Sequence, residues 1–441
     1  MSTTLDATHD ASLRSWVSGA NDPNADYPIQ NLPAGMFQSR RDSLVQVGIA
    51  IGDRILNLSA CAETGLLPRE IAASVRVATS DESLNWLMSS GRELAAALRV
   101  ALVELLQEDN AAARRRASEL SIPLKDAEMR LPAKIGDYSD FYASMHHAMN
   151  VGSMFRPDNP LLPNYKYVPV GYHGRASSIV VSGTPIRRPM GQTRDDANAA
   201  PVYGPSRRLD YEIEVGAFVG AGNPQGETIP ISRAEDHLWG LCLVNDWSAR
   251  DIQSWEYQPL GPFLAKSFAT SVSPWVVTLD ALAPFRVPAV PRPAGDPAPL
   301  PYLSDAADQQ RGGIDLTLEV WLRSAAMRAN DAAPMLVSRG RFRDMYWTVG
   351  QMVAQHASNG CNLQPGDLIA SGTVSGPSKE SRGCLLERTW RGSEALELPT
   401  GERRAFLEEG DEVIMRGYAE REGFRRIGLG ECVGVVSSPS E

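Results

Sequence analysis

Short runs in which hydrophobic and polar residues alternate recur along much of the chain, and one longer run has helical spacing. Residues 45–51 (Val-Gln-Val-Gly-Ile-Ala-Ile) alternate closely enough to predict a strand. Leucine and alanine recur at intervals of three or four between residues 94 and 105, which predicts an amphipathic helix ending near Glu108. Ser90 and Glu93, spaced by three, predict a capping box at the start of that helix.

The pattern changes after Pro132, where glycine and proline separate many short apolar runs. Runs such as 178–182 and 216–219 have the length and composition of strands. The Pro-rich residues 283–301 predict a loop, and strand alternation resumes over 312–322. These patterns predict a mainly β fold with some α-helix.

The same patterns divide the chain into two expected domains. Residues 1–131 contain a small β unit and the predicted helix, and residues 132–441 form a larger β-rich domain. The N-terminal segment 1–25 is polar, and we expect it to be frayed. We expect the basic run 114–116 to be a solvated helix end rather than a binding patch.

Composition and charge narrow the class of function. The 441 residues are 43% hydrophobic and 22% charged, which is ordinary for a globular protein. The net charge of -10 argues against a nucleic-acid partner, because such binding uses Lys and Arg to neutralise phosphates. No run reaches the roughly 18 apolar residues of a membrane span, and no signal-like segment starts the chain. Five cysteines without a C-x-x-C pair favour a reducing compartment, so we expect a cytoplasmic protein.

Two glutamates share one face of the strand expected at residues 211–215. Alternation places Glu212 and Glu214 together, opposite the apolar residues of the segment. In an apolar neighbourhood two carboxylates need a cation or a proton. A solvent-facing strand with two surface glutamates is the alternative, and this segment alone does not decide between them.

Two further segments have acidic and basic groups at helical spacing. Asp246, Arg250 and Gln253 are at i, i+4 and i+7, so a helix would place all three on one face. The alternative is a plain helix N-cap at Asp246 with Arg250 as its surface partner. Asp140 and His147 are also spaced by i and i+7, and a pairing with an acid would distinguish a base from an ordinary packed histidine.

A lysine and four carboxylates complete the candidate chemistry. Lys266 lies in an otherwise apolar run, where it is costly unless it meets an anion or reaches the surface. Asp140, Glu212, Glu214 and Asp246 form an oxygen-only ligand inventory without cysteine or clustered histidine, which favours Mg²⁺ or Ca²⁺. Spacing leaves open whether the four carboxylates converge.

Long motifs point to a known family. They are Ile-Gly-Asp-Tyr-Ser-Asp-Phe-Tyr at 135–142, Pro-Val-Gly-Tyr-His-Gly-Arg-Ala-Ser-Ser at 169–178 and Asn-Asp-Trp-Ser-Ala-Arg-Asp-Ile-Gln at 245–253. With further segments at 256–263, 360–363 and 366–373, the chain closely resembles the fumarylacetoacetate hydrolase family over roughly residues 25–436.

This resemblance implies a homodimer with a small N-terminal SH3-like barrel and a large C-terminal β-roll domain. The implied reaction is hydrolysis of the carbon–carbon bond of 4-fumarylacetoacetate, a small anionic diketo acid, to fumarate and acetoacetate in tyrosine and phenylalanine degradation. The implied cofactor is Ca²⁺ or Mg²⁺, at a site formed by Asp140, Glu212, Glu214, Asp246, Lys266 and Thr270. The implied catalytic residues are His147, Glu387, Arg250, Gln253 and Lys266, and the implied substrate contacts are Tyr142, Arg156, Tyr172, Arg250, Gln253 and Thr373.

The chemistry of these residue types agrees with that reaction. His147 is suited to take a proton from water if Glu387 holds its other nitrogen, and a metal would polarise the diketone. Arg250, Gln253 and Lys266 are suited to donate to the enolate that develops as the bond breaks.

Two alternatives remain at this point. One is an acylpyruvate or other β-diketone hydrolase of the same superfamily, against which Arg156, Tyr142 and Tyr172 argue. The other is a catalytically silent, metal-stabilised scaffold, which would need neither His147 nor Glu387.

Overall fold

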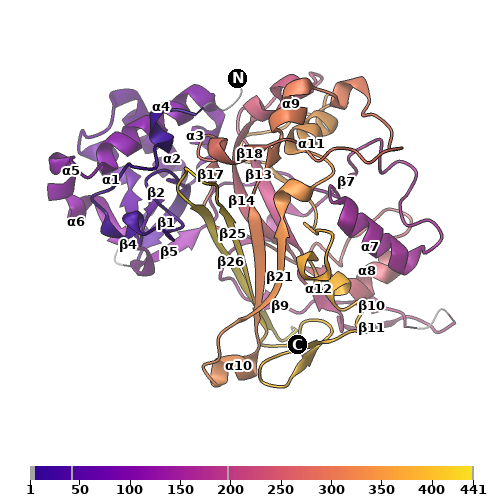
Figure 1. Cartoon of the computed structure of the whole chain (residues 1–441). Helices are drawn as coiled ribbons and strands as arrows, with labels where there is room; N and C mark the ends of the chain where they lie inside the picture. Colours follow the sequence, from indigo (N-terminus) through magenta and orange to yellow (C-terminus); the bar gives the residue numbers. More distant parts are fainter. Residues whose placement is uncertain (1–4, 41–42, 196–197, 440–441) are drawn as a thin grey trace.

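A computed structural model describes residues 5–40, 43–195 and 198–439. A smaller N-terminal part packs beside a larger β-rich part (Figure 1). This mainly β architecture with some helix confirms the predicted fold class. Within the described ranges, none of the helices combines the length and apolarity needed to cross a bilayer.

The N-terminal part is a five-stranded antiparallel sheet with helices packed on it. The strand order is β4-β3-β2-β1-β5. The strands are β1 (Ala34–Ser39), β2 (Val45–Ile51), β3 (Arg54–Asn57), β4 (Ser121–Pro123) and β5 (Ala127–Arg130). The helices are α1 (Leu58–Glu63), α2 (Arg69–Asp81), α3 (Asn85–Ser89), α4 (Gly91–Leu106), α5 (Ala111–Arg115) and α6 (Ala117–Leu120). The alternation at residues 45–51 therefore predicted β2 with its observed bounds.

The predicted amphipathic helix is α4, and it buries Leu98, Leu102 and Leu105. The predicted capping box is wrong. Ser90 has helical backbone angles because it follows directly on α3, and its hydroxyl donates to the Trp86 carbonyl (2.7 Å) instead of accepting from the first turn of α4. The basic run at 114–116 does end a short helix, as expected.

The expectation that the N-terminal segment 1–25 is frayed is wrong for its described part. The buried guanidinium of Arg99 in α4 donates to Thr8 Oγ1 (2.8 Å) and to the Gln30 carbonyl (2.6 Å). Nε2 of His9 lies 2.8 Å from the Asp280 carbonyl oxygen in the larger part. A buried arginine needs acceptors, and Thr8 of this polar segment supplies one of them beside the Gln30 carbonyl further along the chain.

The larger part is built on two sheets. The eight-stranded sheet has the order β7-β6-β22-β13-β14-β16-β8 with β17 beside β14, and the five-stranded sheet has the order β21-β20-β25-β26-β9. The strands of the first are β6 (Tyr138–Phe141), β7 (Gly171–His173), β8 (Ile179–Val181), β13 (Ile213–Val219), β14 (Leu238–Asp246), β16 (Thr270–Val272), β17 (Val277–Thr278) and β22 (Leu368–Ala370). The strands of the second are β9 (Ile186–Arg187), β20 (Thr317–Arg323), β21 (Met335–Arg341), β25 (Glu412–Ala419) and β26 (Ile427–Ser437).

Short pairs of strands and helices complete the larger part. The pairs are β10 (Met190–Thr193) with β11 (Val202–Pro205), β12 (Leu209–Asp210) with β15 (Ser248–Ala249), β18 (Arg286–Val287) with β19 (Gly313–Ile314), and β23 (Leu396–Glu397) with β24 (Arg403–Arg404). The helices are α7 (Met145–Phe155), α8 (Arg250–Glu256), α9 (Ala306–Arg311), α10 (Ala325–Ala329), α11 (Val349–His356) and α12 (Leu385–Arg388).

The eight-stranded sheet is covered on both faces. On one side β14 lies against β25 and β26, with a core shared between the two sheets. On the other side Phe218, Val244 and Leu368 pack in the same buried cluster as Leu98 and Leu102 of α4. A strand buried on both faces needs no alternation, and every residue of β14 is buried. The division of the chain at residues 131 and 132 stays a prediction.

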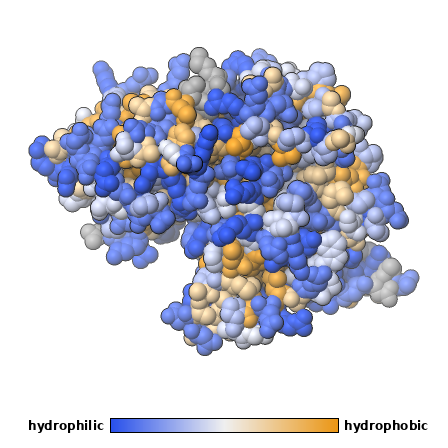
Figure 2. Space-filling model, viewed as in Figure 1, coloured by the Kyte–Doolittle hydropathy of each residue, from blue (hydrophilic) through white to orange (hydrophobic). Residues whose placement is uncertain are grey.

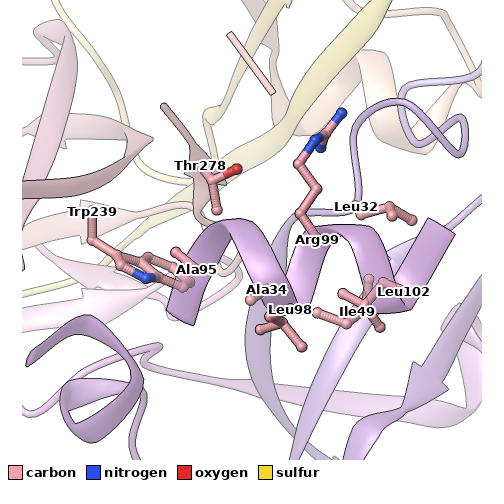
Figure 3. Close-up of a pocket in the computed structure, with 9 residues that line it drawn as sticks. All are labelled: Leu32, Ala34, Ile49, Ala95, Leu98, Arg99, Leu102, Trp239 and Thr278. Carbon is pink, nitrogen blue, oxygen red and sulfur yellow. The ribbon is translucent and has the colours of Figure 1, made fainter. Parts of the chain in front are cut away.

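A small cavity lies where α4 meets the eight-stranded sheet (Figure 3). Its volume is about 20 Å³, and its lining is mainly apolar apart from Arg99, Trp239 and Thr278. Nε1 of Trp239 is buried without a hydrogen-bond partner among the described residues. The space is sufficient for one water molecule and is too small for an organic substrate.

The outer face of the five-stranded sheet has an apolar band, and hydrophobic surface gathers over this sheet in Figure 2. Leu336, Trp321, Ile414 and Val433 lie side by side across β21, β20, β25 and β26. Parallel to them runs a row of alternating sign: Arg339, Glu319, Arg416 and Glu431. Ion pairs link Arg339 with Glu319 and Arg416 with Glu431.

Candidate active site

Strands of the eight-stranded sheet bring acidic residues from distant parts of the chain together. Asp140 lies in β6, Glu214 in β13 and Asp246 at the end of β14, where it pairs in register with Thr270 of β16. One carboxylate oxygen from each of Asp140, Glu214 and Asp246 lies within 4.8 Å of the others, and all three residues are buried. Three of the four predicted carboxylates therefore converge; we call them the carboxylate triad.

The helical placement predicted for two of these acids is wrong. Asp246 ends a buried strand, and α8 begins only at Arg250, so neither a shared helix face nor an N-cap at Asp246 exists. Asp140 is in β6 whereas His147 is in α7, so these two do not share a helix either. Within α8, Nη1 of Arg250 does donate to Gln253 Oε1 (3.2 Å). The apolar run before Asp246 forms a central strand because the sheet is covered on both faces.

Glu214 is completely buried, which excludes the solvent-facing alternative for this residue. Neither of its carboxylate oxygens has a hydrogen-bond partner among the described residues. Burial, followed by the charges of Asp140 and Asp246, raises the pKa of Glu214 well above its usual range. Burial and Asp246 raise the pKa of Asp140 in the same direction. The triad thus holds more negative charge than its surroundings neutralise.

The backbone next to the triad requires a glycine. The Gly372 N–H donates to Asp140 Oδ1 (3.1 Å), and the φ angle of Gly372 is +74°. A Cβ at this position would lie 2.1 Å from the Phe141 carbonyl oxygen, so a larger residue would displace the chain that holds Asp140.

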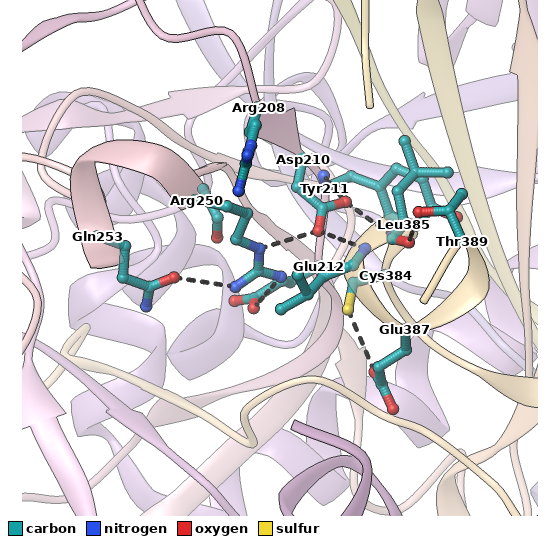
Figure 4. Close-up of polar contacts among 12 residues, drawn as sticks. Arg208, Asp210, Tyr211, Glu212, Arg250, Gln253, Cys384, Leu385, Glu387 and Thr389 are labelled. Carbon is teal, nitrogen blue, oxygen red and sulfur yellow. Dashed lines mark hydrogen bonds and ion pairs between the residues drawn. The ribbon is translucent and has the colours of Figure 1, made fainter. Parts of the chain in front are cut away.

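Glu212 also is buried, but it faces two cations, Arg250 and Lys266, and Figure 4 shows its contact with Arg250. Its Oε1 lies 2.6 Å from Arg250 Nη2, and its Oε2 is in contact with Lys266 Nζ. Burial opposes ionisation, yet Arg250 and then Lys266 hold the pKa of Glu212 well below its usual range. Lys266 also contacts Asp246, so this lysine is buried between two anions and does not reach the surface.

Two hydroxyl groups orient Asp246. Oγ1 of Thr270 donates to its Oδ1 (3.2 Å), and the phenol of Tyr172 donates to its Oδ2 (2.9 Å). Burial raises the pKa of Asp246, although Lys266 opposes this effect. Thr270 and Tyr172 therefore lie beside the triad, where the sequence analysis expected a metal contact and a substrate contact.

The second cluster is a histidine–glutamate pair. Nδ1 of His147, in the first turn of α7, lies 2.6 Å from Oε2 of Glu387 in α12, and both side chains are buried. Oε1 of Glu387 accepts from Asn150 Nδ2 (2.8 Å), and Oε2 accepts from Ser375 Oγ (2.8 Å) and Cys384 Sγ (3.2 Å). Burial opposes ionisation, but His147, Asn150 and Ser375 lower the pKa of Glu387 to about 2. The pair is therefore held with an ionised carboxylate.

Sequence reasoning did not identify Asn150, Ser375 or Cys384. Asn150 follows His147 by three positions, so it shares a helix face with the histidine, and this spacing was an available signal. Ser375 and Cys384 carry no such signal, because strand and loop geometry alone bring them to Glu387. Cys384, His147 and Glu387 also form a three-residue group with metal-ligand types, which the sequence analysis did not expect.

Of the remaining predicted residues, Tyr142 and Thr373 lie beside these clusters, and Arg156 lies past the far end of α7. The ring of Tyr142 packs edge-on against His147 with centroids 5.1 Å apart. Thr373 follows Gly372 and is buried, and its hydroxyl has no partner among the described residues. Arg156 follows the last residue of α7, and its Nη2 donates to the Pro160 carbonyl (3.2 Å).

Both parts of the chain are similar in sequence to known protein families. The family described as "Fumarylacetoacetase N-terminal" matches residues 30–132, and the family described as "Fumarylacetoacetate (FAA) hydrolase C-terminal" matches residues 138–437. Fumarylacetoacetase of Bos taurus is 50% identical over 431 residues, covering 96% of this chain and 98% of the relative. That of Rattus norvegicus is 49% identical over 422 residues, covering 94% and 96%. A solved fumarylacetoacetate hydrolase of Exiguobacterium antarcticum has 17% identity and a TM-score of 0.49, and the match covers 92% of this chain and 99% of that one.

Proposed function

The chain belongs to the fumarylacetoacetate hydrolase family and hydrolyses 4-fumarylacetoacetate to fumarate and acetoacetate, and we propose which of its residues carry out this reaction. The reaction cleaves a carbon–carbon bond of a small diketo acid and belongs to tyrosine and phenylalanine degradation. It requires a base for water, polarisation of a carbonyl group and stabilisation of an enolate leaving group.

His147 is the base, and its pair with Glu387 is the observation that carries the proposal. The ionised Glu387 carboxylate lies 2.6 Å from Nδ1, so a proton on Nδ1 satisfies that contact and leaves Nε2 as an acceptor. Nε2 then takes the proton of the attacking water. Tyr142, packed edge-on against the ring, limits its rotation.

The carboxylate triad fits a divalent cation. Its three members offer only oxygen, and both orphaned oxygens of Glu214 need a positive charge nearby. Hard cations such as Mg²⁺ or Ca²⁺ prefer this donor set. Such an ion would supply Lewis-acid polarisation of the diketone oxygens. Glu212 stays a predicted fourth ligand, with Lys266 and Thr270 beside the site.

The leaving group needs hydrogen-bond donors. Arg250, Gln253 and Lys266 supply them, with Lys266 and Arg250 already held near the triad through Glu212. Tyr172 and the unpaired hydroxyl of Thr373 are further contacts for the substrate. Arg156 is assigned to a substrate carboxylate, because a guanidinium binds this group through two hydrogen bonds.

We also propose a homodimer in the cytoplasm, without nucleic-acid or membrane partners. All five cysteines are free, which suits a reducing compartment. The apolar band on the outer face of the five-stranded sheet is the surface that we assign to a second copy of the chain. Its flanking row of alternating charges is self-complementary in a two-fold arrangement.

The test follows the absorbance of fumarylacetoacetate in the presence of the protein, after chelation and after addition of Mg²⁺ or Ca²⁺. The expected result is substrate loss with acetoacetate release that stops on chelation and returns with the ion. No turnover with any divalent ion would contradict the proposed residue roles, and acylpyruvates would be the next substrates to test.

A further inference from the structure

We infer that Asp210 is a positioning residue that holds Arg250 and the helix carrying Glu387 in one arrangement. The inference rests on the roles proposed above for Arg250 and for the pair of His147 with Glu387. Asp210 ends the short strand β12, just before Tyr211 and Glu212, and its side chain is completely buried. Nothing in its sequence neighbourhood distinguished it from an ordinary buried acid.

Both oxygens of Asp210 have two donors each (Figure 4). Oδ1 accepts from the backbone N–H groups of Tyr211 (2.8 Å) and Leu385 (2.7 Å). Oδ2 accepts from the backbone N–H of Leu386 (2.9 Å) and from Nε of Arg250 (2.9 Å). One carboxylate thus joins β12, the start of α8 and the start of α12.

The consequence for Glu387 follows from the length of α12. This helix has only four residues, and its N-cap residue Cys384 makes no side-chain capping bond. A helix this short has too few internal hydrogen bonds to fix its own direction. Asp210 satisfies the first two N–H groups of the helix from outside, and Glu387 is the next residue after them. The carboxylate that orients His147 therefore depends on Asp210.

The consequence for Arg250 concerns the direction of its guanidinium. With Nε bound to Asp210, the two terminal nitrogens point elsewhere: Nη1 donates to Gln253 (3.2 Å) and Nη2 lies 2.6 Å from Glu212. Without Asp210 the planar group has no partner that fixes its rotation at Nε. The base and the enolate donor would then lose alignment together, and small displacements of reacting groups cost about 10²-fold in rate.

The first test is Asp210→Asn. An amide keeps the shape but places an NH₂ group against one of the two pairs of donors, and it removes the charge beside Arg250. We expect kcat to fall about 30-fold to 100-fold, while KM changes less than about threefold, because the aligned groups act in the transition state. Asp210→Ser is a second variant that is smaller and avoids two opposed donors, and the same kcat-specific loss is expected.

Asp251→Asn is the matched control. Asp251 is also buried and follows Arg250 in α8, but its carboxylate accepts from Ser206 Oγ (2.6 Å), the Arg207 N–H (2.7 Å) and the Ile252 N–H (3.1 Å), and these contacts include neither the Arg250 guanidinium nor α12. Its loss is expected to lower the melting temperature and to leave kcat within about threefold of the wild type. An equal fall of kcat in Asp251→Asn and Asp210→Asn would overturn the inference, since any buried acid would then have the same effect.

A double-mutant cycle tests the route through Arg250. In an Arg250→Lys background the partner at Nε is absent and only the route through α12 remains, so Asp210→Asn is expected to lower kcat by less than the fall expected in the wild-type background. A fall in kcat as large as that in the wild-type background would overturn the coupling between Asp210 and Arg250. His147→Ala is measured alongside: if it abolishes turnover while both Asp210 variants keep wild-type kcat, the positioning role is wrong, and if it keeps turnover, the proposed role of His147 as the base is wrong instead.

Discussion

Glu214 and Glu387 are both completely buried glutamates of the candidate active site, and they have opposite properties. The pKa of Glu214 is raised well above its usual range, whereas that of Glu387 is lowered to about 2. Burial acts to raise the pKa in both cases. The difference is in the partners: Glu387 has His147 and three further donors, while Glu214 has two anions as neighbours and no donor among the described residues.

The comparison shows that burial alone does not identify a functional acid. A carboxylate such as that of Glu387 has all its hydrogen-bond donors within the protein. Its role is to hold another side chain, here His147, in place. A buried carboxylate without donors is incomplete until a proton or a cation arrives. The two sites should therefore respond in opposite ways to mutation, ions and pH.

The largest effect is expected from His147→Ala. Removal of the proposed base should lower kcat about 10³-fold, because general-base catalysis contributes typically 10²-fold to 10⁴-fold. The readout is the rate of fumarylacetoacetate loss. His146→Ala is the control on the same helix, since this neighbouring histidine has no part in the proposed mechanism. Turnover that survives in His147→Ala would show that the pair of His147 and Glu387 is not needed for catalysis.

Glu214→Gln should have the next largest effect. We expect the substitution to remove the rise in melting temperature that divalent ions cause and to lower kcat/KM about 10²-fold. For a wild-type protein at an ion concentration of 100 Kd, binding stabilises the fold by about 2.7 kcal/mol. Without ion, Glu214→Gln should melt above the wild type, because an amide relieves the repulsion within the triad. Glu387→Gln serves as the control that keeps the ion response, and an unchanged ion response in Glu214→Gln would refute the assignment of the triad.

The two sites should also have opposite pH dependence in protein stripped of metal. Glu214 has a folded-state pKa above that of the unfolded chain, so its contribution to stability is greatest at low pH and declines as pH rises through the folded value. Glu387 stabilises the fold above its ordinary pKa of 4.5, and this contribution is lost only as pH falls toward about 2. Thermal denaturation in chelator should therefore show a melting temperature that falls from pH 5 to pH 8 in the wild type and less so in Glu214→Gln. A slope that is identical in both proteins would rule out Glu214 as its source.

The smallest effect is expected from Ser375→Ala, which removes one of the donors to Glu387. One hydrogen bond to a charged group contributes about 1.5–3 kcal/mol, but three donors remain. We expect kcat to fall about threefold to tenfold with little change in KM, measured in the same assay. A fall in kcat as large as that of His147→Ala would mean that Ser375 alone, and not the donors together, holds the Glu387 carboxylate in its orientation.

Elements with a clear periodic pattern were predictable from the sequence, and uniformly apolar ones were not. Helix α4 has an exposed face that its helical spacing reveals, and strand β2, although almost entirely buried, keeps an alternation that predicts a strand. Strand β14 is apolar on both faces, and its polar last residue Asp246 was therefore mistaken for the start of a helix. The order of the N-terminal segment was missed because it depends on the buried Arg99, far away in the sequence.

The candidate site was predictable only as a set of residue types. Strand pairing between segments that are distant in the sequence brings Asp140 to Glu214, and no spacing rule contains that register. The pairing of His147 with Glu387, 240 positions away, came from the family resemblance and not from any local pattern. Asp210 was missed because its importance lies in four donors that only the folded chain assembles.

The core that joins α4 to the eight-stranded sheet affects how the protein unfolds and is degraded, as well as how it works. Leu98 and Leu102 share one cluster with Phe218, Val244 and Leu368, so the N-terminal part covers one face of the sheet that contains the carboxylate triad. A chain that lacked everything before β6 would leave that sheet face bare and would aggregate. Thermal unfolding should then be a single cooperative transition. A cavity made at Leu98, far from any reacting atom, would reduce the amount of active protein in a cell through proteolysis of the unfolded chain, with kcat of the surviving molecules unchanged.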